Sequence, residues 1–306
     1  MTETAGAAGG GLGDGAGVLV FGRGGQVATE LARVLPGATF LSRAEADLSD
    51  PASCAAAVEG AGDLAAVINA AAWTAVDAAE AEEGAARVVN AAAPAAMARA
   101  CAARGLPFLH VSTDYVFDGS GARPWREDDP TGPLGAYGRT KLAGERAVAQ
   151  AMGGVPHAIV RTSWVVSAHG SNFVKTMLRL SETRDALSVV EDQVGGPTPA
   201  ADIAATLAAL AARCAADPAA PSGLYHYGGA PAVSWAEFAR AIFALAGRDV
   251  AVAGIPSSDY PTPAARPANS RMDGGKLLAE HGIAPPDWRA GLRAILAELG
   301  ALKETE

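Results

Sequence analysis

The sequence of 306 residues is poor in cysteine, and the three cysteines that it has lie far apart. Cys54, Cys101 and Cys214 each stand in an alanine-rich helical pattern. An odd number of cysteines without a regular spacing offers no disulfide framework and is typical of a reducing compartment. We therefore interpret all three as small buried hydrophobic residues, with a catalytic thiol as the alternative.

Long apolar runs and an excess of positive charge are also missing. No run approaches the roughly 20 apolar residues that a membrane-spanning helix needs. The formal net charge of −9 argues against a nucleic-acid surface and against attraction to anionic membranes. Residues 1–17 are rich in glycine and alanine and lack the basic and apolar segments of a signal peptide. We expect a disordered leader there and a cytoplasmic protein.

The chain does contain short apolar segments that alternate with helical patterns. The expected strands are 18–21, 38–41, 65–69, 107–111 and 158–160. Such alternation predicts an α/β fold with a Rossmann-type, doubly wound parallel sheet. Longer loops rich in Gly and Pro follow, so we predict a dinucleotide-binding domain over 18–165 and a smaller substrate-binding domain over 166–306. The helix expected over 200–215 could return to the first domain.

A glycine-rich turn, Gly22-Arg23-Gly24-Gly25-Gln26-Val27-Ala28, follows the first expected strand. Glycine permits a sharp turn and a close backbone approach, and the start of the next helix offers free N–H groups to a pyrophosphate. We therefore predict that Gly22, Gly25, Gln26 and Val27 bind a dinucleotide, with an ordinary tight turn as the alternative.

The end of the second expected strand bears on the choice of cofactor. An acidic residue there would accept hydrogen bonds from a ribose 2′-hydroxyl. Ser42 and Arg43 occupy this place and suit a 2′-phosphate instead. We predict NADPH as the preferred cofactor, with NADH also used; a solvated loop arginine is the alternative interpretation. Asp47 and Leu48 are candidates to flank the adenine ring.

Tyr137 and Lys141 are separated by one helical turn and therefore share a helix face. An ammonium near a phenol favours the phenolate, so we expect a lowered Tyr137 pKa and proton transfer near neutral pH. Thr113, at the end of a neighbouring strand, could hold a substrate oxygen beside this phenol. The pattern predicts carbonyl or alcohol chemistry, with a plain helix-surface pair as the alternative. Tyr115 competes as the acid but lacks a lysine at helical spacing.

Longer motifs in a fixed order carry a resemblance to a known family. They are Asn69–Asp77, Ser112–Gly119, Tyr137–Glu145, Arg161–Trp164, Asn172–Leu178 and Tyr260–Arg271. Together they resemble the extended short-chain dehydrogenase/reductase family and, within it, the dTDP-4-dehydrorhamnose reductases. The similarity runs from about Val18 to Leu296.

The resemblance implies reduction of dTDP-4-dehydro-β-L-rhamnose to dTDP-β-L-rhamnose. It implies that Tyr137 is the general acid, that Lys141 tunes it and holds the nicotinamide ribose, and that Thr113 binds the substrate oxygen. The implied cofactor contacts are Gly25, Gln26, Val27, Asp47, Leu48, Ala71, Ala72 and Trp73, together with Tyr137 and Lys141. The implied substrate contacts are Thr113, Asp114, Val116, Trp164, Arg266, Asn269 and Arg271.

Two positions depart from the family pattern. Ser42-Arg43 replaces the acidic residue that many members offer to the adenosine ribose. Some members also bridge subunits through a metal bound by acidic side chains. Glu30 is available for this, but Ala200-Ala201 stand where a second carboxylate is expected. We therefore do not predict a structural magnesium, and we expect a monomer or a homodimer.

Three other functions remain open from the sequence. The chain could reduce a related dTDP-4-keto-6-deoxy sugar, or it could be a nucleotide-sugar epimerase or dehydratase. It could also be a non-catalytic dinucleotide-binding regulatory subunit. Intact Thr113, Tyr137 and Lys141 argue against the silent subunit.

Overall fold

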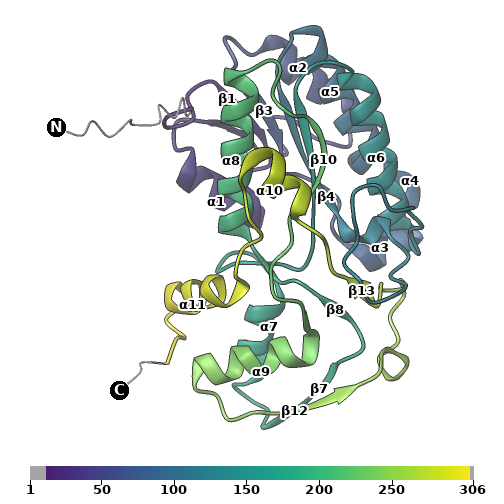
Figure 1. Ribbon diagram of the computed structural model, residues 1–306, viewed down its shortest axis with the longest axis vertical. Coiled ribbons are helices and arrows are strands. Elements are labelled where there is room, and N and C mark those ends of the chain that lie inside the picture. Colours follow the sequence, from purple (N-terminus) through teal and green to yellow (C-terminus); the bar gives the residue numbers. More distant parts are fainter. Residues whose placement is uncertain (1–11, 304–306) are drawn as a thin grey trace, which may run out of the picture.

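The computed structural model describes residues 12–303, so most of the expected leader at 1–17 lies outside the described residues. A six-stranded parallel sheet with the order β10-β5-β4-β3-β1-β2 forms the upper part of the molecule in Figure 1. Its strands are β1 (Val18–Phe21), β2 (Thr39–Leu41), β3 (Ala66–Asn69), β4 (Phe108–Thr113), β5 (His157–Thr162) and β10 (Gly223–His226). The predicted Rossmann-type parallel sheet is confirmed.

Helices cover both faces of this sheet. One face carries α1 (Gln26–Val34), α8 (Ala200–Ala216) and α10 (Gly275–His281), and the other carries α2 (Pro51–Gly60), α5 (Ala93–Ala103) and α6 (Ala136–Met152). Alternate residues of β1 enter the two resulting cores: Val18 and Val20 face α1 and α8, whereas Leu19 and Phe21 face α2 and α5. Burial on both faces explains why the strands read as continuous apolar runs.

The chain returns to the large sheet after residue 165. The helix α8 packs against α1 and β3, and β10 adds the edge strand beside β5. The boundary that the sequence places at 165 therefore does not separate all of the sheet from the second part of the molecule.

The lower part of the molecule in Figure 1 has its own core. It contains α7 (Phe173–Leu180), α9 (Trp235–Ala246) and α11 (Trp288–Glu298). Short strands complete it: β7 (Ala186–Val190) pairs with β12 (Ala251–Ile255), and β8 (Val194–Gly195) lies between β11 (Val233–Ser234) and β13 (Asn269–Ser270). The pair β6 (Val165–Val166) and β9 (Thr198–Pro199) follows β5 and precedes α8.

The helix α9 shows how local sequence fixes an element of this lower part. Ser234 Oγ accepts the Glu237 N–H at 3.2 Å, and the Glu237 carboxylate accepts the Ser234 N–H at 2.9 Å. This reciprocal capping box satisfies two backbone donors that a helix start would leave unpaired. Gly247 ends the helix with a φ of 62°, which glycine adopts without strain.

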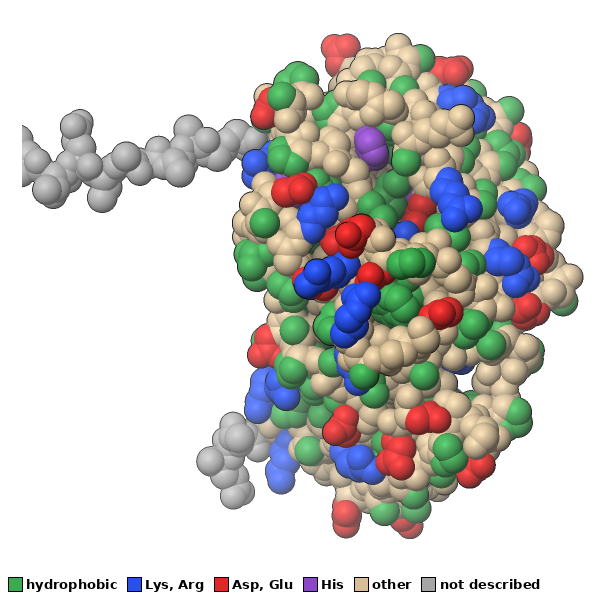
Figure 2. All heavy atoms as spheres, turned by 45° about the vertical axis from the view of Figure 1, so that its right-hand side comes forward, with side chains coloured by type: hydrophobic (Ala, Val, Ile, Leu, Met, Phe, Trp, Pro, Cys, Tyr) green, Lys and Arg blue, Asp and Glu red, His purple; other side chains and the backbone are tan. Residues whose placement is uncertain are grey.

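The charged side chains of the surface and the three cysteines can now be placed in the structure. Figure 2 shows acidic and basic side chains interspersed over one face of the molecule. None of the described helices is long and apolar enough to cross a membrane. Cys54, Cys101 and Cys214 are buried, and burial raises the thiol pKa of Cys101 to about 12 and of the other two to about 11.

Candidate active site

A cleft of about 1130 Å³ opens at the carboxyl ends of β1, β3, β4 and β5. Open α/β sheets bind ligands at this edge. Residues that follow β5 in the chain, including Val165, Gly170 and Ser171, also line the cleft. Most of the site residues predicted from sequence line it: Gly22, Gly25, Gln26, Val27, Ser42, Arg43, Asp47, Leu48, Ala71, Ala72, Trp73, Thr113, Asp114, Tyr137, Lys141 and Trp164.

The glycine-rich turn fits a dinucleotide pyrophosphate. Gly22 has a φ of +104°, and a Cβ there would approach Ala71 to 3.3 Å. A Cβ on Gly24 or Gly25 would meet nothing within 4 Å, so the turn presents open space to the cleft. The helix α1 then begins at Gln26 without a side-chain cap, which leaves its first N–H groups free for an anion.

The end of the cleft that the sequence predicts to hold adenosine carries two arginines. Arg43, whose side chain is 83% exposed, donates to Asp47 at 3.2 Å. Arg23 lies 3.9 Å from Glu45, which also accepts bonds of 2.8 and 2.7 Å from the Ser42 amide and hydroxyl. The sequence prediction used Ser42 and Arg43 but overlooked Arg23. The sequence of a glycine-rich turn does not show in which direction the side chain of a residue within it points.

The helix α6 approaches two neighbouring segments closely because glycine stands at two of its positions. A Cβ on Gly138 would collide with the carbonyl oxygen of Tyr115, and one on Gly144 would collide with that of Asn90. Asn90, on the π-helix η1 (Val88–Ala92), also donates to Thr140 Oγ1 at 3.1 Å and to the Trp73 carbonyl at 3.2 Å. These contacts fix the turn of α6 that carries the predicted acid.

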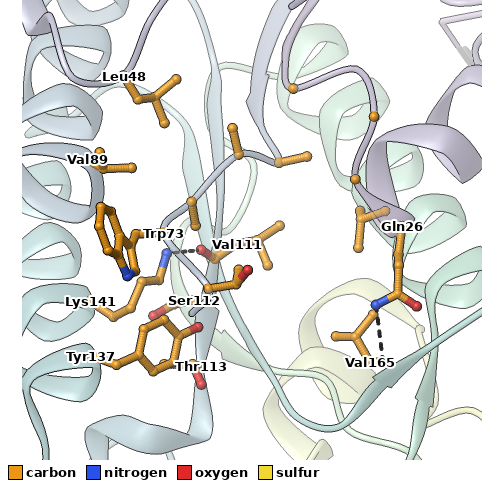
Figure 3. A pocket seen from close by; sticks show the side chains of 18 of the residues that line it. Gln26, Leu48, Trp73, Val89, Val111, Ser112, Thr113, Tyr137, Lys141 and Val165 are labelled. Carbon is orange, nitrogen blue, oxygen red and sulfur yellow. Dashed lines mark hydrogen bonds between the residues drawn. The ribbon is translucent and has the colours of Figure 1, made fainter. Parts of the chain in front are cut away.

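Tyr137 and Lys141 project side by side from α6 toward Thr113 and Val111 (Figure 3). The expected lowering of the Tyr137 pKa is wrong: burial raises it to about 12, although a hydrogen bond with Thr113 acts in the opposite direction. Lys141 Nζ donates to the Val111 carbonyl at 2.7 Å, and burial lowers the pKa of this amine to about 8. Desolvation therefore sets the direction of both shifts, contrary to the lowered phenol pKa that the spacing alone predicted.

Polar groups without partners lie beside these two side chains. Asp114 is 2% exposed, and its Oδ1 accepts the Thr113 hydroxyl at 3.0 Å. Among the described residues, no hydrogen-bond partner reaches Asp114 Oδ2 or Thr162 Oγ1, and both residues line the cleft. Burial raises the pKa of Asp114 to about 6, although hydrogen bonds with Ser270 and Thr113 lower it. Two buried polar atoms thus remain for a polar ligand.

The competing tyrosine packs against the predicted one. The rings of Tyr115 and Tyr137 meet edge to face, with centroids 5.4 Å apart. Tyr115 lines the cleft, and burial raises its pKa well above the ordinary value. The structure therefore brings both phenols to the site.

A buried ion pair lies beneath the site. Arg161 on β5 makes two hydrogen bonds of 2.8 and 2.7 Å to Glu145 on α6. Glu145 also accepts the Ser112 hydroxyl at 2.5 Å, and Arg161 approaches His226 Nε2 to 3.3 Å. Paired, hydrogen-bonded charges of this kind join α6 to β4, β5 and β10.

Trp164, which lines the cleft, has an unusual backbone conformation. Its φ of 47° lies in the left-handed region, which a bulky residue rarely adopts. Its ring stacks on Trp235 of α9 with centroids 3.5 Å apart. Strained residues of this kind cluster at ligand sites.

Four predicted substrate residues do not line the cleft. Val116 is fully buried in a core with Phe117 and Trp125, so its side chain packs the interior. Arg266 pairs with Asp77 through two bonds of 2.8 Å. Asn269 donates to the carbonyls of Ser120 and Arg123 and accepts from the amide and guanidinium of Arg271. The Tyr260–Arg271 motif makes these internal contacts in the structure, and the substrate-binding role expected from sequence stays a prediction.

One cluster of possible metal ligands occurs among residues 12–303. Ligand atoms of Glu30, His169 and Glu298 lie within 4.8 Å of one another. Arg33 already bonds Glu298 at 2.5 Å and Glu30 at 3.5 Å. A guanidinium between the carboxylates does not suit a divalent cation. The sequence prediction considered Glu30 but did not foresee that loop residue His169 and the helix α11 would join it.

Comparison with known proteins shows the family to which this chain belongs. The family model of the RmlD substrate binding domain matches residues 16–301. The dTDP-4-dehydrorhamnose reductase of Burkholderia thailandensis is 46% identical over 92% of this chain and 98% of its own length. That of Sinorhizobium fredii is 43% identical over 91% and 96%. The solved dTDP-4-dehydrorhamnose reductase of Bacillus anthracis, in complex with NADP, matches with a TM-score of 0.85 at 32% identity over 92% and 98%.

Proposed function

Because the chain belongs to the dTDP-4-dehydrorhamnose reductase family, we propose that it reduces dTDP-4-dehydro-β-L-rhamnose to dTDP-β-L-rhamnose. The single observation that carries this proposal is the convergence of Thr113, Tyr137 and Lys141 in one cleft beside a glycine-rich turn. An acid, a hydroxyl and a buried cation at the end of a dinucleotide-binding sheet suit the reduction of a carbonyl.

The cofactor of this reaction is NADPH, which supplies the hydride that the carbonyl carbon receives. The open turn at Gly24 and Gly25 and the uncapped start of α1 would hold its pyrophosphate. Arg23 and Arg43 would hold the 2′-phosphate, because a guanidinium suits bidentate phosphate recognition. Both arginines are now paired with carboxylates, so phosphate binding replaces exposed ion pairs that contribute little stability.

The proton that the carbonyl oxygen needs comes from Tyr137. A phenol whose pKa is raised to about 12 stays protonated at neutral pH, which is the state required of a general acid. Its O–H bond breaks as the substrate oxygen becomes a hydroxyl, and the carbon that gains the hydride becomes the alcohol carbon. The Thr113 hydroxyl, which donates to Asp114 Oδ1 in the structure, would turn to donate its hydrogen to the same substrate oxygen and so stabilise the negative charge that develops there.

The sugar would lie between Asp114 and Trp164. Asp114 Oδ2 and Thr162 Oγ1 are buried acceptors that sugar hydroxyl groups satisfy. The indole of Trp164, held by Trp235, offers a flat apolar face to the ring.

Incubation of the purified protein with NADPH and dTDP-4-dehydro-β-L-rhamnose tests the proposal. Net oxidation of NADPH with formation of dTDP-rhamnose is expected. A silent regulatory subunit gives no reaction, and an epimerase or dehydratase gives a new sugar without net oxidation. Parallel reactions with other dTDP-4-keto-6-deoxy sugars show whether the rhamnose precursor has the highest kcat/KM; a higher value for another sugar would reassign the substrate.

A further inference from the structure

A line of buried polar groups runs behind Lys141, and the proposed reaction does not use it. It begins at the backbone amide of Ala71, passes through Asn69 on β3 and His110 on β4, and ends at the Lys141 amine. Asn69 and His110 are 0% exposed and Lys141 is 2% exposed. Water therefore does not compete for these bonds, and their directions are fixed by the groups themselves.

The direction of the first two bonds follows from the Ala71 amide. Its N–H donates to Asn69 Oδ1 at 3.1 Å, which fixes the orientation of the Asn69 side-chain amide. Asn69 Nδ2 then faces His110 Nδ1 at 3.1 Å, and this nitrogen has only N–H groups to offer. His110 Nδ1 must therefore accept. Turning the amide would set Nδ2 against the Ala71 N–H, with two donors facing each other.

The proton of the His110 ring is consequently on Nε2. Burial, together with the charge of Lys141, lowers the pKa of His110 well below its ordinary value, so the ring is neutral. A neutral imidazole that accepts at Nδ1 carries its hydrogen at Nε2. His110 Nε2 lies 3.4 Å from Lys141 Nζ, so an N–H points at the lysine nitrogen.

An N–H in this position distinguishes the two forms of Lys141. An uncharged amine has a lone pair that accepts this hydrogen, whereas an ammonium has only hydrogens and meets it as a second donor. The other bond of Lys141, to the Val111 carbonyl at 2.7 Å, is available to both forms. Every donor in the chain of hydrogen bonds from Ala71 to Lys141 thus faces an acceptor when Lys141 is neutral. When Lys141 is charged, two donors face each other at its end.

We propose that Asn69 and His110 are positioning residues that hold Lys141 near the balance between ammonium and amine, and so set the pH at which the site loses its cation. Glu145, one turn along α6, acts in the opposite direction because its carboxylate favours the ammonium, and Arg161 on β5 shares that charge. Tyr137 is the other titratable group beside Lys141, and its raised pKa keeps it uncharged. Burial acts in the same direction as His110 by disfavouring the ammonium.

Only the kinetic test of this role, the pH dependence of kcat/KM, rests on the proposed reductase activity. If the ammonium of Lys141 is needed for turnover, kcat/KM falls as pH rises through the Lys141 pKa. The position of this alkaline limb then reports the balance that Asn69 and His110 set.

The tautomer is tested first, on the wild-type protein. In ¹⁵N-histidine-labelled protein, long-range ¹H–¹⁵N correlation spectra should show His110 as the Nε2–H form from pH 6 to pH 9, with the His110→Gln variant identifying its signals. An Nδ1–H tautomer, or an imidazolium in this range, overturns the proposal. This result does not depend on the identity of the substrate, so failure of the proposed function is distinguished from failure of this inference.

The kinetic test uses a variant that reverses which groups donate and which accept in this chain of hydrogen bonds. In Asn69→Asp a carboxylate accepts from both Ala71 N–H and His110 Nδ1, so Nε2 is left to accept from the ammonium. The alkaline limb of kcat/KM should move up by about one pH unit, a tenfold change in the equilibrium. His110→Gln, whose amide can keep the original polarity, should leave the limb near its wild-type position.

A matched pair of variants separates this effect from simple charge attraction. In a His110→Leu background, Asn69→Asp adds the same carboxylate but has no ring through which to act. We expect less than half of the shift there. An equal shift in both backgrounds, in proteins whose thermal midpoints show that they are folded, means that charge alone moves Lys141 and overturns the role of His110.

Discussion

Two of the polypeptide segments that carry family motifs behave differently in the structure. Along α6, Tyr137 and Lys141 face the cleft while Thr140 and Glu145 bond other elements. In the segment Tyr260–Arg271, by contrast, Arg266 pairs with Asp77 of the helix α3 (Val76–Ala81), and Asn269 with Arg271. A helix fixes the direction of each side chain by its spacing, whereas a loop leaves direction to distant partners. A cationic side chain in a loop motif can therefore be assigned to ligand binding only when its hydrogen-bond partners within the protein are known.

The largest effect is expected from the α6 segment itself. Tyr137→Phe should lower kcat by about 10²–10⁴-fold, because the transferable proton is lost, and should leave NADPH affinity nearly unchanged. Steady-state kinetics and cofactor titration measure the two quantities. Tyr115→Phe is the matched control, since it removes the neighbouring phenol and keeps the edge-to-face ring contact. A Tyr137→Phe enzyme with wild-type kcat, or an equal loss in Tyr115→Phe, would contradict the assignment of the acid.

The next effect concerns what holds α6 in place. Glu145→Gln leaves Arg161 as a buried charge without its partner, so the free energy of unfolding should fall by about 3–5 kcal/mol. Urea denaturation measures the change. Glu83→Gln is the control. It breaks an exposed ion pair with Arg139, which lies on α6 as Glu145 does, and should lower the free energy of unfolding by less than about 1 kcal/mol. Similar losses in the two variants would mean that burial of the Arg161 pair does not matter.

A smaller effect is expected from the loop segment. Arg266→Ala and Asp77→Ala should raise the substrate KM by a similar factor, about fivefold for 1 kcal/mol, because each releases the same brace. The double variant should be no worse than either single one, since both remove one interaction. A much larger loss in Arg266→Ala alone would show instead that this arginine contacts the nucleotide-sugar, as the sequence predicted.

The smallest effect lies at the adenosine end of the cleft, where an exposed arginine again stands in a loop. Arg43→Ala should raise the KM for NADPH by about tenfold or less, equivalent to at most about 1.4 kcal/mol, and leave that for NADH unchanged. Arg23→Ala, measured in parallel, shows which guanidinium serves the 2′-phosphate. Equal changes with both cofactors would mean that Arg43 is structural.

Much of the fold was predictable from local sequence. The expected strand 18–21 coincides with β1, and the expected helix 200–215 agrees with α8 to within one residue, because a short apolar run and a 3.6-residue pattern are each read within one segment. The pairs β7–β12 and β8–β13 were not predicted. Their strands are short, and they join residues more than 60 positions apart, so no single segment contains the signal.

The sequence by itself determined the α/β order, the glycine-rich turn and the shared face of Tyr137 and Lys141, since spacing along one chain segment decides each of these. Only the tertiary structure decided the charge states of the side chains at the site and the partners to which they bond. It partly buried Tyr137 so that its pKa rises, brought His110 and Asn69 behind Lys141, and paired Arg266 with Asp77 across 189 positions. The physical reason is that desolvation and hydrogen-bond partnership depend on which distant elements meet, and no local pattern records that meeting.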